Sequence, residues 1–148
     1  MPARLHCLAL LTAVLVIAGC AGHTTLREDT VEAVLPLPPD QVRSALVAVL
    51  EADDYSVRTA EDERVVETGY RKQFDGPWGW LLTARFGVDR SKVNAVMSSE
   101  GMDSTRLSLS VTHQAKDHVW SSWEGTTAPP HRDAGLHLRS LKLALGLL

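Results

Sequence analysis

The sequence has few cysteines, few aromatic residues other than tryptophan, and no excess of basic charge. Its 148 residues include two Cys, two Phe, two Tyr and four Trp. Fifteen Lys and Arg against 18 Asp and Glu give a net charge of −3. Proteins that bind nucleic acid neutralise phosphates with clustered basic residues. The composition therefore argues against nucleic acid as a partner, and it also argues against a polybasic membrane-binding patch.

The first 19 residues have the layout of an export signal. Arg4 gives a positive start, and residues 5–18 are almost wholly apolar. A transmembrane helix needs about 20 apolar residues, so this run is short for a span and is typical of a secretory signal. Cys7 would leave with the signal. Cys20 would then be the only cysteine, and the exported chain could form no internal disulfide.

The apolar run ends in Ile17-Ala18-Gly19-Cys20, an aliphatic residue and two small residues before a cysteine. This segment resembles the lipobox of bacterial lipoproteins. The resemblance implies that a signal peptidase of type II cleaves between Gly19 and Cys20, and that diacylglycerol, typically bearing palmitate, is attached to the Cys20 sulfur. This covalent lipid is an anchor and not a cofactor, and we expect no cofactor. The alternatives are an ordinary signal peptide with a coincidental cysteine, or an uncleaved anchor.

The residue after the cysteine bears on which membrane holds the anchor. An aspartate there favours retention in the inner membrane of enteric bacteria, whereas this chain has Ala21. We therefore expect an anchor in the outer membrane, with the protein facing the periplasm; the inner membrane is the alternative.

Residues 20–29 form a lipidated N-terminus and a short polar tether, and residues 30–148 are expected to form a single α+β domain. Apolar residues alternate or recur at helical spacing along it. The patterns predict strands at 30–35, 55–59, 65–70, 92–98 and 105–113, helices at 40–52 and 132–148, and a further short strand at 118–123, with 81–88 ambiguous. The predicted fold is an antiparallel sheet of four to six strands with two helices on one face, in the order β-α-β-β-β-β-α, which is helix-grip-like.

Part of this pattern resembles a family of periplasmic lipoproteins. The residues concerned are Pro38-x-Asp40-x-Val42-x-x-Ala45-x-x-x-Val49-Leu50, then Asp54-Tyr55-x-Val57, then Asp62-x-x-x-Val66-Glu67-Thr68. They are similar to the helix-grip domains of BamC, also called NlpB, over roughly residues 30–113 and the closing helix. The resemblance implies the fold, with one such domain here against two in that family, and a shared fold does not fix function.

Residues suited to catalysis or metal binding are scattered. We expect His113, His118, His131 and His137 to lie on the surface, because no Cys or carboxylate repeats beside them at ligand spacing. The serines of 98–99 and 121–122 lack an elbow motif, and a nucleophile needs a nearby base. The carboxylates of 53–54 and 61–63 are typical of solvated turns. We therefore predict no metal site and no enzymatic activity.

The segment from Gln73 to Trp80 is the one that invites a functional interpretation. Phe74, Trp78 and Trp80 form a contact loop if they are exposed, because Trp and Phe are enriched at interfaces. The alternative is that they fold back to cap a small core. Trp120 and Trp123 are predicted to pack in the core or at its edge.

Together these features predict a membrane-anchored, periplasm-facing lipoprotein that acts as a non-catalytic interaction or accessory module of the cell envelope, with another envelope protein as partner. The alternative function is a carrier or sensor of a small apolar ligand or lipid held between helix and sheet.

Overall fold

The structure is a computed structural model that describes residues 28–58, 60–72, 78–118 and 120–148, without the side chains of residues 80, 83 and 86. The predicted signal, Gly19, Cys20 and most of the tether lie outside the described residues. The chain runs β1 (Glu28–Leu35), α2 (Pro39–Ala52), β2 (Val57–Arg58), β3 (Val65–Thr68), β4 (Arg71–Lys72), α3 (Gly79–Phe86), β5 (Val88–Ser99), β6 (Thr105–Lys116), β7 (Glu124–Gly125) and α4 (Ala134–Ala144).

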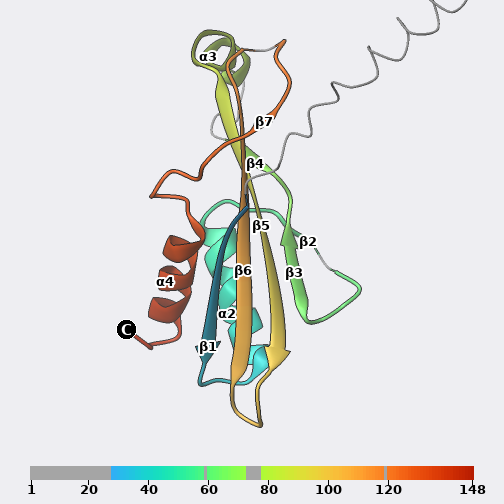
Figure 1. The fold of residues 1–148 in the computed structure, drawn as a ribbon, viewed down its shortest axis with the longest axis vertical. Helices are drawn as coiled ribbons and strands as arrows, with labels where there is room; N and C mark the ends of the chain where they lie inside the picture. Colours follow the sequence, from blue (N-terminus) through green and yellow to red (C-terminus); the bar gives the residue numbers. More distant parts are fainter. Residues whose placement is uncertain (1–27, 59, 73–77, 119) are drawn as a thin grey trace, which may run out of the picture.

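A long antiparallel hairpin of β5 and β6 forms the middle of the sheet (Figure 1). Its register runs from Val88 opposite Lys116 to Ser99 opposite Thr105. In β6, Leu107, Leu109 and Val111 are buried, while the residues between them are more exposed, so one face is apolar. The turn reverses at Gly101, whose φ of 95° suits glycine.

The other strands extend this hairpin on both sides in the order β1-β6-β5-β3-β2, with β4 also paired to β5 and β7 to β6. All pairs are antiparallel. Strand β1 starts opposite Thr112 and ends with Leu35 opposite Thr105. Between β3 and β5, the Thr68 hydroxyl accepts from the Val93 N–H at 2.9 Å and lies 3.3 Å from the Val93 carbonyl oxygen.

Helices α2 and α4 pack against each other and against the same face of the sheet. Pro39 occupies the first turn of α2, where a missing N–H is harmless, and Asp40 suits the positive end of the helix dipole. The Asp133 side chain caps α4 by accepting from the Leu136 N–H. Asp29 of β1 accepts from the Ala134 N–H at 2.8 Å, so the first strand holds the start of the last helix.

The core lies between these two helices and the sheet. Burying one such aliphatic side chain contributes about 1.5–3 kcal/mol, so this layer is the main source of stability. Its buried members are Leu35, Val42, Leu46, Leu50, Tyr55, Val66, Val93, Ala95, Met97, Leu107, Leu109, Val111, Ala134, Leu138 and Leu141.

The predicted class, an antiparallel α+β sheet with two helices on one face, is confirmed, and the arrangement is helix-grip-like. Among the described residues the sheet has seven strands, because the two-residue strands β4 and β7 add to the expected ones. The expected strand at 55–59 is present only as the two-residue strand β2. The expected strand at 65–70 is divided: β3 ends at Thr68, and the next strand, β4, begins at Arg71 and pairs with β5. The described residues of the expected strand at 118–123 are not in a strand, and β7 follows them.

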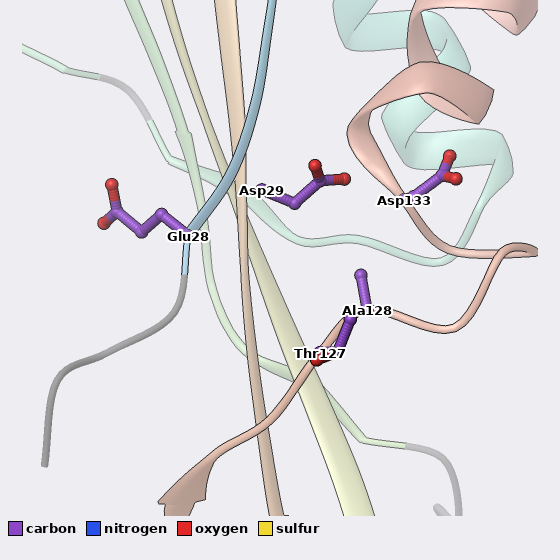
Figure 2. Close-up of a pocket in the computed structure, with 5 residues that line it drawn as sticks. All are labelled: Glu28, Asp29, Thr127, Ala128 and Asp133. Carbon is purple, nitrogen blue, oxygen red and sulfur yellow. The ribbon is translucent and has the colours of Figure 1, made fainter.

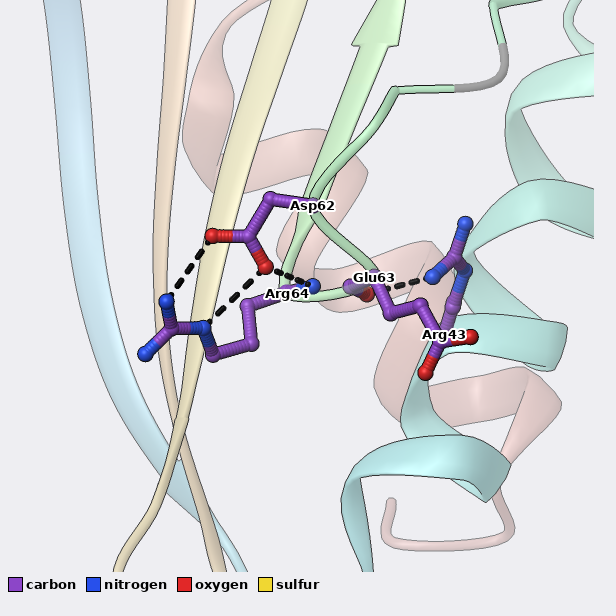
Figure 3. A network of polar contacts seen from close by, with 4 residues as sticks. All are labelled: Arg43, Asp62, Glu63 and Arg64. Carbon is purple, nitrogen blue, oxygen red and sulfur yellow. Dashed lines mark hydrogen bonds and ion pairs between the residues drawn. The ribbon is translucent and has the colours of Figure 1, made fainter.

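The charged turn between β2 and β3 is solvent-exposed, as predicted, and it is tied to α2 (Figure 3). The Arg64 guanidinium donates to both Asp62 carboxylate oxygens, at 3.1 and 2.9 Å. These hydrogen bonds lower the pKa of Asp62 and raise that of Arg64. Arg43 of α2 donates to the Glu63 carbonyl oxygen. The network positions the turn, and exposed pairs of this kind add little stability.

Candidate functional site

One end of the sheet carries an exposed apolar surface. Helix α3 directly precedes β5 and the segment starting at Asp117 directly follows β6, so the pairing of Val88 with Lys116 brings both to the same end. Figure 1 shows both beyond the upper end of the hairpin. We call the large exposed side chains here the tip: Trp78 (70% exposed), Leu81 (42%), Leu82 (37%) and Trp120 (92%).

Gly87 lets the two chain segments that carry the tip approach each other closely. Gly87 links α3 to β5 with a φ of 73°, which favours glycine. A Cβ at this position would lie 2.5 Å from the Lys116 carbonyl oxygen and 3.2 Å from Asp117. Only glycine therefore lets the end of α3 come so close to the end of β6.

Helix α3 is short, and its described side chains are exposed. Leu81, Leu82, Ala84 and Arg85 are all exposed, and α3 has no extensive contact with any other helix or strand that the structure describes. Isolated helices shorter than about 12 residues are marginal in water. An external apolar surface covering Leu81 and Leu82 would stabilise this helix. No helix among the described residues is long and apolar enough to span a membrane.

Arg90 of β5 stacks against two aromatic rings, and one of them belongs to the segment that follows Trp120. The Arg90 guanidinium lies 4.1 Å from the Tyr70 ring centroid and 3.9 Å from that of Trp123. It also donates to Gln114 Oε1 at 2.7 Å. Burial lowers the pKa of Arg90. The sequence does not reveal this stack, because Tyr70, Arg90 and Trp123 lie in separate segments of the chain.

The predicted contact loop is only partly described. Phe74 lies outside the described residues, as does the side chain of Trp80, whereas Trp78 is exposed. The prediction that Trp120 packs in the core or at its edge is wrong, because its side chain is exposed and the described residues 120–123 form no strand that could carry it inward. Trp123 does pack at the edge, on Arg90 and 5.1 Å from the Lys116 ammonium nitrogen.

Two of the four histidines predicted to lie on the surface are buried. His113 continues the inward face of β6, and its Nε2 lies 3.0 Å from the Arg132 carbonyl oxygen. His137 is on the inward stripe of α4, with its ring edge-on to Tyr55 at 5.6 Å. The surface expectation is therefore wrong for both. The positions of His118 and His131 agree with it.

His137 belongs to a polar cluster at the end of α2, in which His137, Tyr55 and Ser91 are buried and Asp53 is partly exposed. Its Nδ1 lies 3.3 Å from Asp53 Oδ2. Tyr55 shares a 2.7 Å hydrogen bond with the Ser91 hydroxyl, and Arg71 lies over the Tyr55 ring. Burial lowers the pKa of His137, although the Asp53 carboxylate opposes that shift. Ser91 has no exposed surface, so a substrate could not reach its hydroxyl without the fold opening.

An acidic hollow of about 320 Å³ lies where β1 meets the start of α4, lined by Glu28, Asp29, Thr127, Ala128 and Asp133 (Figure 2). The carboxylates do not converge, because Glu28 and Asp29 point to opposite sides of β1. Asp29 and Asp133 already accept from backbone N–H groups of α4. No three His, Cys, Asp or Glu side chains among the described residues gather closely enough to hold a metal ion.

Comparison with known proteins identifies no family. No protein-family model matches the sequence, and no curated protein matches it. The resemblances to the lipobox and to BamC therefore stay predictions.

Among solved structures, one that is similar is the protein XoxI from Bacillus cereus, with 9% identity, a TM-score of 0.31, and coverage of 82% of this chain and 87% of that one. Another is Ara h 8.0201, with 14% identity, a TM-score of 0.33, and coverage of 82% and 99%. Likenesses this weak carry no argument about function.

Proposed function

We propose that this protein is a lipoprotein anchored through Cys20 to the outer membrane, faces the periplasm, and acts as a non-catalytic accessory or interaction module of the cell envelope. The observation that carries the proposal is Ile17-Ala18-Gly19-Cys20 at the end of an apolar run. Its partner would be another envelope protein, and nucleic acid is not expected as one.

The position of the domain in the chain supports this proposal. Strand β1 begins at Glu28, eight residues after Cys20. Eight extended residues span at most about 29 Å. A lipid on Cys20 would therefore keep the folded domain beside the bilayer, where it meets other envelope proteins.

The packing of the core favours an interaction module over the alternative, a carrier of an apolar ligand. Leu46 of α2, Leu109 of β6 and Leu141 of α4 meet between helices and sheet with no exposed surface. A side chain without exposed surface borders no space large enough for a water molecule. An apolar ligand could enter between these side chains only by pushing the helices off the sheet.

A non-catalytic role is supported by the cluster around His137. Histidine, aspartate and serine occur together there, but Ser91 and His137 are both buried. Ser91 also bonds Tyr55 and not the histidine. The cluster is thus better suited to joining α2, α4 and the sheet than to reacting with a substrate.

Metabolic labelling tests the anchor. Cells given labelled palmitate should incorporate label into this protein, and Cys20→Ala should abolish both the label and membrane association. Cys7→Ala is the matched control, because this cysteine lies within the predicted signal and its loss should leave labelling intact. An unlabelled mature protein with a free Cys20 thiol would contradict the proposal.

The role as a module needs a separate experiment. The anchored protein, extracted in mild detergent, should retain an envelope protein in a fixed ratio. Native mass spectrometry of the same sample distinguishes the alternative, because a carrier would retain a lipid or small apolar molecule instead.

A further inference from the structure

We propose that the tip is a membrane-contacting surface. In this arrangement Trp78, Leu81, Leu82 and Trp120 enter the interface of the bilayer that holds the Cys20 lipid, and lipid and tip together fix the orientation of the domain. The inference rests on the lipid anchoring proposed above, and it adds a second membrane contact made by the folded protein itself.

The direction of the first strand places the anchor on the same side as the tip. Strand β1 is antiparallel to β6, and its first residue, Glu28, lies opposite Thr112. Strand β6 then continues to Lys116, where the tip begins. The chain that leads back to Cys20 therefore joins the half of the sheet that carries α3 and Trp120. The opposite end is the turn around Gly101 (Figure 1).

The lengths match. From Thr112 to Lys116 is four residues, about 14 Å at the rise of a strand. A helix lying across the end of the sheet adds about 10 Å. The outer surface of the tip is thus about 24 Å beyond the level of Glu28, and eight extended residues reach about 26–29 Å. The segment from Cys20 to Glu28 is long enough for the tip to touch the bilayer and too short to let the domain move far from it.

The chemistry of the tip suits a bilayer interface. Tryptophan combines a large apolar ring with an N–H donor, and it concentrates at the level of lipid headgroups. Amphipathic helices can bury an apolar face at this boundary, and Leu81 and Leu82 give α3 exposed apolar side chains that could do so. Four large apolar side chains exposed together at one end also differ from the single exposed residues normal on a protein surface.

Charge near the tip is mixed, so the apolar side chains carry the proposed contact. Basic and acidic side chains alternate there among the described residues, namely Lys72, Arg85, Arg90 and Lys116 against Asp89, Asp117 and Glu124. We therefore expect binding to uncharged phosphatidylcholine surfaces and little dependence on salt. Attachment through a polybasic patch would require anionic lipid.

Labelling at the two ends of the hairpin tests the inference. Cys20 is blocked by lipid in the mature protein, so one introduced cysteine can carry an environment-sensitive dye. Trp120→Cys places the dye on the tip. Met102→Cys is the matched control, because Met102 is 94% exposed but lies at the far end of β5, whose 12 residues span about 40 Å. The full lipidated protein is reconstituted in phosphatidylcholine vesicles, and flotation of the vesicles is checked in the same samples.

The expected result is a blue shift with loss of emission to bromine-labelled acyl chains for the dye at 120, and neither change for the dye at 102. Protein that floats without this difference would overturn the membrane-contacting tip while leaving the anchor intact. Protein that does not float would overturn both. A shift at 120 that needs added envelope protein would show that the occupant is a protein and not the bilayer. Leu82→Cys provides a second label position if Trp120→Cys is not exported.

Discussion

The helix-covered half of the molecule, where α2 and α4 pack on the sheet, contains the same kinds of apolar side chain as the tip. Only the helix-covered half buries them. Leu141 of α4 has no exposed surface, whereas Leu81 and Leu82 of α3 are more than a third exposed. The difference comes from what faces each helix. Helix α4 lies against α2, β1 and β6, and α3 has no comparable neighbour among the described residues.

Helix length and pattern explain why one half packs and the other does not. Helix α2 runs for 14 residues and turns Val42, Leu46 and Leu50 to the sheet, which presents a matching apolar face. Helix α3 has eight residues, its described apolar side chains are exposed, and no described strand makes extensive contact with it. Apolar residues in a sequence therefore indicate burial only where a second element supplies the facing surface.

The largest change in the free energy of unfolding is expected from a substitution in the helix-covered half. Leu141→Ala should lower the free energy of unfolding by about 2–5 kcal/mol, because it leaves a cavity between α4 and the sheet. Leu143→Ala, two residues along the same helix and 59% exposed, should change it by less than about 0.5 kcal/mol. Urea denaturation followed by circular dichroism measures both. Equal effects at the two positions would mean that α4 does not pack on the sheet as described.

A smaller change in stability is expected from the protonation of the buried His137 at low pH. Burial lowers the pKa of His137 in the folded protein, so between that pKa and the ordinary value of about 6.5 the unfolded chain binds more protons than the folded one. Stability is thus fully present above pH 6.5 and decreases as the pH falls towards the folded pKa. Unfolding measured from pH 8 to pH 5 should show this loss.

The groups around His137 define the control for the pH experiment. Asp53 and Asp133 favour its protonated form, while burial and Arg71 oppose it. His137→Leu should remove the part of the pH dependence between pH 7 and pH 5 that comes from this ring. Asp53→Asn should instead lower the pKa of His137 further, because the opposing carboxylate is lost. A pH profile unaffected by His137→Leu would contradict the assignment.

The fold could be predicted because its signals are local. Leu107, Leu109 and Val111 alternate in one continuous strand, and the stripe of α2 repeats at helical spacing. These patterns fix which face is apolar, and short connections between strands require antiparallel pairing. The small strands β4 and β7 could not be predicted, because two residues show no period and depend on the neighbour they pair with.

The candidate site could be predicted only in part, because exposure is a non-local property. The density of aromatics singled out Trp78, which is exposed, but Trp120 was expected to be packed and is also exposed. The burial of His137 depends on Tyr55, which lies 82 positions earlier in the chain. The Arg90 stack likewise joins Tyr70 to Trp123. No single segment contains these contacts.

The smallest effect on stability is expected at the tip, and two tryptophans three positions apart allow a matched test. Trp120 is exposed, and Trp78→Ala combined with Trp120→Ala should change the free energy of unfolding in detergent-free buffer by no more than about 1 kcal/mol, since single exposed substitutions cost within about 0.5 kcal/mol. Trp123→Ala should cost more than Trp120→Ala, because Trp123 stacks on Arg90 and such contacts are worth about 0.5–2 kcal/mol. Thermal melting by circular dichroism gives the ranking. If the double change at 78 and 120 instead cost several kcal/mol, these rings would be capping the core, the tip would belong to the packed half of the molecule, and its contrast with that half would disappear.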